Sequence, residues 1–164
     1  MNEILQTISF NEEDNTKKAY VDFRIRSDIL NPQEVSQELG VTPTRAWEKG
    51  EKYLGKARNP DTKEFYTEWH EQPWGMWHLN TEKIVSDVRV EKHILYLIGL
   101  LEPKKEQLAK YLAHKKDYSI DFLIHWEPFD DWGSYSVNSD LLARMAALCH
   151  EVEFAFRATC PPEE

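Results

Sequence analysis

The sequence predicts an α+β fold, a two-layer sandwich in which helices pack on one face of a mostly antiparallel sheet. Several segments alternate apolar and polar residues with a period of two, as half-buried strands do. Between them lie segments whose apolar residues recur every three or four positions, which indicates helices. Two similar segments, YVDFRI and YSIDFLI, each lead toward a helix. This echo favours two β–α halves and makes a ferredoxin-like arrangement our leading topology.

The N-terminal part supplies a clear strand and a clear helix. Residues 20–26 alternate and form the first strong strand, and a shorter strand is expected over residues 4–10. A helix is expected over residues 32–39, because Asn31 can cap its first turn and Gly40 favours a left-handed stop.

Residues 42–73 are the least regular part of the chain, with proline, glycine and charged residues mixed together. An unstructured loop of this length is unusual in a compact domain. We therefore expect either a hairpin, in which residues 63–69 pair with residues 74–79, or a flap with a functional role.

The central part of the chain predicts a long helix and a second strong strand. Asp87 can cap a helix over residues 88–102, and Pro103 should end or kink it before a further helical segment. Residues 118–126 alternate strictly, so they should form a half-buried strand.

The C-terminal part predicts a strand, a helix and a closing strand. We expect a short strand over residues 134–137 and a helix that Ser139 caps and that ends near residue 149. Residues 152–156 alternate and should complete the sheet, and residues 158–164 form a tail.

Length and charge narrow the class of protein. The 164 residues suit one domain spanning residues 1–164. With 20 basic and 29 acidic residues, the net charge of −9 disfavours binding to nucleic acid and to anionic membranes. Two cysteines, Cys149 and Cys160, have neither disulfide-scaffold density nor zinc-site spacing, and no signal peptide is recognisable. A cytoplasmic protein is expected.

Four segments carry a resemblance to a known family. They are NPQEVSQELGVTPTRAWEKGE, GMWHLNT, HILYLIGLLEP and YSVNSDLLARMAALC, in this order and spacing. Over residues 19–157 the chain resembles the bacterial family catalogued as domain of unknown function 4279. It departs from the family pattern in an acidic N-terminal extension and in the insert KYLGKARNPDTKEF. The resemblance implies a small soluble bacterial domain and transfers no catalytic residue.

Two groups of residues are candidates for a binding site. Arg45 and Trp47 lie in a turn-like segment, where the guanidinium group could bind a carboxylate or phosphate and the indole could form a wall, or where both could simply anchor the loop. The second group would lie on the sheet face that turns away from the helices. By alternation this face carries Asp22, Arg24, Arg26, Asp121, His125, Glu153 and Arg157, and also His78 if Trp77 and Leu79 point inward. The candidates among them are Arg24, His78, Asp121 and His125. If residues 42–73 cross this face, it becomes a polar pocket; otherwise it is a solvated surface.

Known catalytic and metal-binding patterns are absent from the sequence, so we expect no catalytic residue, no metal and no cofactor. Aromatic residues near turns are typical of protein-binding surfaces, although they also plug the edges of small sheets. The group here consists of Trp69, Trp74, Trp77, Trp126 and Trp132, with Phe129.

Three functions remain open. The leading hypothesis is a non-enzymatic domain that neutralises or regulates a basic protein partner, in the style of an immunity protein. The alternative is a small-molecule-binding domain or small enzyme with its pocket on the open sheet face, lined by Arg24, Arg45, His78 and His125. A homodimer through that face or through an edge strand is a third hypothesis.

Overall fold

Strand β1 (Thr16–Ser27) lies at the centre of a five-stranded sheet with the order β2-β5-β1-β6-β7. The computed structural model describes residues 16–129 and 133–157. Antiparallel to β1 run β5 (Gly75–Asn80) and β6 (Ser119–Pro128), while β2 (Arg45–Trp47) pairs antiparallel with β5. Strand β7 (Glu151–Phe156) runs parallel to β6 at the other edge. The α+β class and the mostly antiparallel sheet are confirmed.

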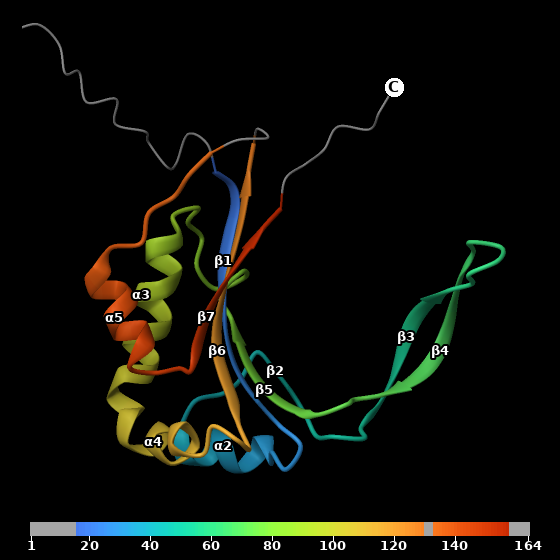
Figure 1. Ribbon diagram of the computed structural model, residues 1–164, viewed down its shortest axis with the longest axis horizontal. Helices are drawn as coiled ribbons and strands as arrows, with labels where there is room; N and C mark the ends of the chain where they lie inside the picture. The colour runs from blue at the N-terminus through green and yellow to red at the C-terminus, as the bar shows by residue number, and fades with distance from the viewer. Residues whose placement is uncertain (1–15, 130–132, 158–164) are drawn as a thin grey trace, which may run out of the picture.

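The helices lie on one side of this sheet (Figure 1). They are α2 (Pro32–Leu39), α3 (Val90–Leu101), α4 (Lys105–Ala113) and α5 (Ser139–Ala146), and a 3₁₀ turn, η1 (Glu102–Lys104), joins α3 to α4. Proline at position 103 lacks the N–H group that would continue α3, which explains the interruption. Between helices and sheet lies the core, which the apolar face of β1 enters with Val21, Phe23 and Ile25.

Helix α2 follows its local sequence closely. The side chain of Asn31 accepts hydrogen bonds from the backbone N–H groups of Gln33 and Glu34, and Gly40 ends the helix with φ 60°. The predicted bounds of 32–39 are confirmed. The Trp77 indole donates to Ser36 Oγ over 2.9 Å, which fixes α2 against β5.

A second, two-stranded sheet projects from the first. Strands β3 (Lys52–Arg58) and β4 (Phe65–Glu71) pair with each other and form a hairpin on the side of the sheet opposite α3 and α5 (Figure 1). The predicted hairpin was therefore paired wrongly. The segment around β4 pairs with β3, whereas β5 pairs with β1 and β2.

Several local predictions need correction. Asp87 does not cap α3; it accepts hydrogen bonds from the backbone and side chain of Arg89. Asn138, rather than Ser139, caps α5 and accepts from the N–H group of Leu141. Residues 134–137 do not form a strand. The strand expected over residues 4–10 lies outside the described residues.

The ferredoxin-like arrangement is not confirmed. That βαββαβ topology predicts parallel strands at the centre of the sheet, whereas β1 is antiparallel to both its neighbours and the parallel pair β6–β7 lies at an edge. Among the described residues, no helix is long and apolar enough to cross a membrane.

Candidate functional site

Alternation along the strands gathers polar side chains on the sheet face opposite the helices. Because Phe23 and Ile25 enter the core, Asp22, Arg24 and Arg26 point the other way. Register then places Arg24 between His78 on β5 and Asp121 on β6. The four candidate residues Arg24, His78, Asp121 and His125 thus share this face, as the sequence predicted.

Part of this face is a closed cluster of ion pairs. Asp121 has no exposed surface, and its carboxylate contacts Arg24 and Arg26 at 2.6 Å each. A second carboxylate, Glu153 on β7, lies 3.3 Å from Arg24. Two guanidinium groups and two carboxylates balance each other here, so Arg24 is engaged inside the protein and does not present a free cation to a ligand.

A second cluster surrounds Asp22. Its carboxylate lies 3.0 Å from Nε2 of His78 and 2.9 Å from Nε2 of His125, and it accepts a 2.6 Å hydrogen bond from the Asn80 amide. Burial alone would raise the pKa of Asp22, but these three neighbours outweigh it and hold the pKa far below its ordinary value. The Tyr20 ring stacks on His125 with centroids 4.2 Å apart.

The two candidates on β2 are not part of either cluster. Arg45 is exposed opposite His78, and Trp47 is half-buried with an indole Nε1 that finds no hydrogen-bond partner among the described residues. Trp132 lies outside the described residues. The sequence analysis missed Asn80, although its position two residues after His78 on one strand would have placed it on the same face.

The β3–β4 hairpin carries a different kind of surface. Its two faces follow from the pairing: Leu54 lies opposite Trp69, and Arg58 lies opposite Phe65. Phe65 is 72% exposed, Trp69 69% and Leu54 58%. We call the face formed by Lys52, Leu54, Lys56, Arg58, Phe65, Thr67, Trp69 and Glu71 the outer hairpin face.

On the opposite hairpin face two side chains pack against each other. The imidazole of His70 lies over Gly55, where an added Cβ would sit 2.5 Å from the ring. Tyr53 stacks on the same imidazole with centroids 5.4 Å apart. The hairpin faces therefore differ in degree: Tyr53 is 42% exposed and Tyr66 47%, less than the apolar side chains of the outer hairpin face.

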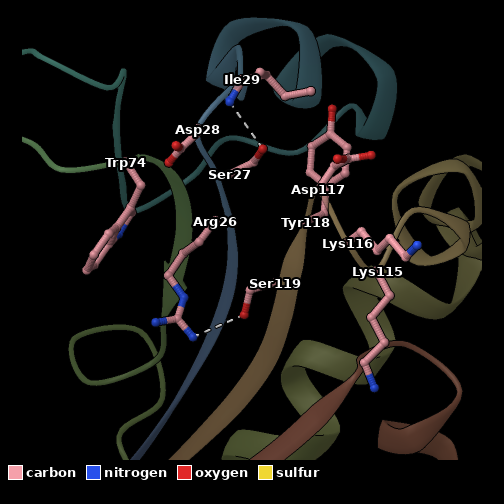
Figure 2. A pocket seen from close by; sticks show the side chains of 10 residues that line it. All are labelled: Arg26, Ser27, Asp28, Ile29, Trp74, Lys115, Lys116, Asp117, Tyr118 and Ser119. Carbon is pink, nitrogen blue, oxygen red and sulfur yellow. Dashed lines mark hydrogen bonds between the residues drawn. The ribbon is translucent and has the colours of Figure 1, made fainter.

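A hollow of about 510 Å³ lies where β1 ends and β6 begins, and Figure 2 shows its lining. Two of its polar side chains are already used: Arg26 binds Asp121 and Ser119, and the Ser27 hydroxyl accepts from the N–H group of Ile29. In the same view Lys115 and Lys116 extend away from Arg26. The hollow has size but no converging polar groups, so we do not assign it as a site.

Nucleophilic and metal chemistry find little support within the described residues. No group of three or more histidine, cysteine or acidic side chains there could hold a metal ion. Cys149 is a buried free thiol, and burial raises its pKa to about 11, which keeps it protonated at neutral pH.

The comparison with family models identifies the chain. A model described as Domain of unknown function (DUF4279) matches residues 17–158. The chain belongs to this family. No curated protein and no solved structure matches the chain. Residues 52–65, which the sequence analysis expected to depart from the family pattern, cover β3 and the turn before β4.

Proposed function

We propose that this member of the DUF4279 family is a non-enzymatic protein-binding domain that regulates or neutralises a partner, and that the outer hairpin face is its binding surface. The observation that carries the proposal is the exposure of Leu54, Phe65 and Trp69 on one face of a projecting hairpin. Large apolar side chains that cluster on an exposed surface are typical of protein interfaces.

The energetics of the hairpin support this proposal. An isolated two-stranded hairpin is at best marginally stable in water, because it has no core beneath it. Burying an exposed aromatic or leucine side chain contributes roughly 1.5–3 kcal/mol. A partner that covers the outer hairpin face would therefore stabilise both the complex and the hairpin itself.

The charge of this face indicates what kind of partner fits. Lys56 and Arg58 flank the apolar residues, and Arg58 also packs over the ring of Phe65 at 5.8 Å. The net charge of −9 favours a partner that is basic overall, and we propose this for the molecule as a whole. For the outer hairpin face we propose a partner surface that is apolar at its centre and acidic at its rim.

The polar sheet face supports a structural role in this scheme. Arg24 and Arg26 both form ion pairs with Asp121. Charged groups that are paired with each other inside the protein hold the strands together and are not free to bind a partner. We propose the cytoplasm as the location, in keeping with the free thiol of Cys149.

The test is affinity capture from a lysate of the source organism, grown under several conditions, with quantitative mass spectrometry. The bait is the full chain as wild type and as a Leu54→Ser/Trp69→Ser double variant. The control bait is Tyr96→Ser, which removes an exposed aromatic ring from α3 instead. A partner should be enriched by the wild type and the control, and at least about tenfold less by the double variant.

Two results would overturn the proposal: no enriched protein under any condition, or equal enrichment by all three baits. If the captured protein is the chain itself, sedimentation should show a dimer that the double variant dissociates. That outcome would support the outer hairpin face as the binding surface and make a second copy the partner.

A further inference from the structure

A small hollow lies at the end of the polar sheet face, where β1 begins and β6 and β7 end (Figure 1). Its volume is about 220 Å³, below the usual range for drug-sized ligands, so it suits a small group. The polar side chains in its lining are Lys18, Tyr20, His125, Glu127 and Arg157. These residues are separate from the outer hairpin face.

His125 is held in a fixed orientation at this hollow. Its Nε2 atom lies 2.9 Å from the Asp22 carboxylate, and its ring is stacked on Tyr20 at an interplanar angle of 16°. With Nε2 directed to Asp22, the other ring nitrogen, Nδ1, is the atom left to bind a ligand. Nδ1 forms no hydrogen bond within the described part of the chain. A carboxylate that positions an imidazole in this way sets both its tautomer and its direction.

The cations of the hollow are not equally engaged. Lys18 is paired with Glu82 and lies over the Tyr20 ring at 5.2 Å. The acidic residue of the lining, Glu127, is bound by Lys17 at 2.6 Å. Arg157 is exposed and forms no ion pair within residues 16–129 and 133–157, although its charge helps to lower the pKa of Glu127. Its guanidinium group can therefore still bind an anion.

We propose that this hollow binds a small oxyanion, a carboxylate or phosphate group, between Arg157, Lys18 and His125. Arg157 would supply a charge-assisted, bidentate contact. With Nε2–H facing Asp22, Nδ1 of His125 carries the lone pair and would accept a hydrogen bond from a protonated oxygen of the bound group. Ala155 on β7 has only a methyl group, so it leaves space above the His125 ring. This site does not depend on the proposed protein-binding function, because the two use different residues.

The site differs from the one expected from sequence. The sequence placed a pocket over Arg24, Arg45, His78 and His125. In the structure Arg24 is occupied by Asp121, and His78 is only 9% exposed beside Asp22, so His125 is the member of that set that reaches a hollow.

The experiment is an NMR titration that follows the imidazole C–H signals of the full-length protein at constant pH and ionic strength. Inorganic phosphate and acetate are the probes in separate titrations. We expect the His125 signal to shift saturably while that of His114, on the far side of the molecule, does not. Tighter binding of phosphate would identify a phosphate group as the natural ligand chemistry, and tighter binding of acetate would identify a carboxylate.

Two variants complete the test. Arg157→Gln should weaken binding roughly tenfold or more, because it removes a charge-assisted contact. Arg45→Gln removes the same charge from the same sheet face at the opposite edge and should leave the affinity unchanged. The proposal is overturned if neither probe shifts His125 saturably, if Arg157→Gln binds as tightly as wild type, or if Arg45→Gln weakens binding equally.

Discussion

The five-stranded sheet and the β3–β4 hairpin differ in what covers their strands. In the sheet, helices bury one face, and ion pairs bury the charged groups of the other, so that Asp121 is as inaccessible as Phe23. In the hairpin, Tyr53 and His70 stack on one face but stay partly exposed, and Trp69 and Phe65 on the other face are largely exposed. The sheet is thus complete by itself, whereas the hairpin has apolar surface that a second molecule can bury.

The largest expected effect comes from replacing one tryptophan by alanine in each region. Trp77→Ala should destabilise the protein by about 3–5 kcal/mol, because this fully buried indole fills the core and binds Ser36. Trp69→Ala should change the stability by less than about 0.5 kcal/mol, because its side chain is exposed. Urea denaturation measures both. Similar losses for the two variants would mean that the hairpin is part of the cooperative core.

Ion pairs provide the second test. Asp121→Ala should cost about 3 kcal/mol or more, because it removes the fully buried carboxylate and leaves Arg24 and Arg26 with only the more exposed Glu153 as a counter-charge. Glu71→Ala, which removes an exposed partner of Lys52 at 4.0 Å, should cost less than about 0.5 kcal/mol. A small effect at Asp121 in the same denaturation assay would argue against a structural role for the cluster.

The pH dependence of the unfolding free energy tests how much the Asp22 cluster stabilises the fold. Its pKa is lowered in the folded protein, so its contribution to stability is present above its unfolded pKa, near 4, and is lost as the pH falls toward the folded value. Asp22→Asn should lower stability at pH 6 by roughly 2 kcal/mol, since it weakens charge-assisted hydrogen bonds. It should also flatten the loss of stability between pH 4 and pH 2. Parallel stability curves for the variant and the wild type would contradict this.

The smallest expected effect comes from removing the hairpin altogether. Gly50 donates to the carbonyl of Gln72, and Gln72 donates to that of Glu51, so the base of the hairpin is closed by backbone hydrogen bonds. Replacing residues 52–71 with an Asn-Gly turn should leave the stability of the remaining protein within about 1 kcal/mol of wild type. Calorimetry can measure this, and loss of a cooperative transition would show that the sheet needs the hairpin.

Sequence reasoning worked where the signals were local. Asn31 and Gly40 fixed α2, because capping depends on a few neighbouring residues. Alternation also placed Arg24, Asp121 and His125 on one face, because side chains along a strand alternate whatever the partner.

It failed where the answer depended on distant partners. Alternation in residues 65–71 could not reveal that β3, rather than β5, is the neighbouring strand. Trp69 belongs to the turn aromatics that the sequence indicated as possible binding residues, but so do Trp77 and Trp126, which are buried in the core. Sequence pattern alone could not separate the exposed tryptophan from the buried ones. The choice of partner for Arg24 likewise depends on the register of β1 against β6, which local sequence does not specify.

The hydrogen-bonded base of the hairpin also affects which sequence changes the protein can tolerate during evolution. Because the chain leaves and re-enters the sheet at two hydrogen-bonded positions, Gly50 and Gln72, residues beyond them can be lengthened, shortened or exchanged without changing the register of β5 on β1. Selection for a new partner can then act on the hairpin while selection for folding acts on the sheet. A lineage built on this fold could change its recognition specificity by insertion and deletion alone, with its structural framework inherited intact.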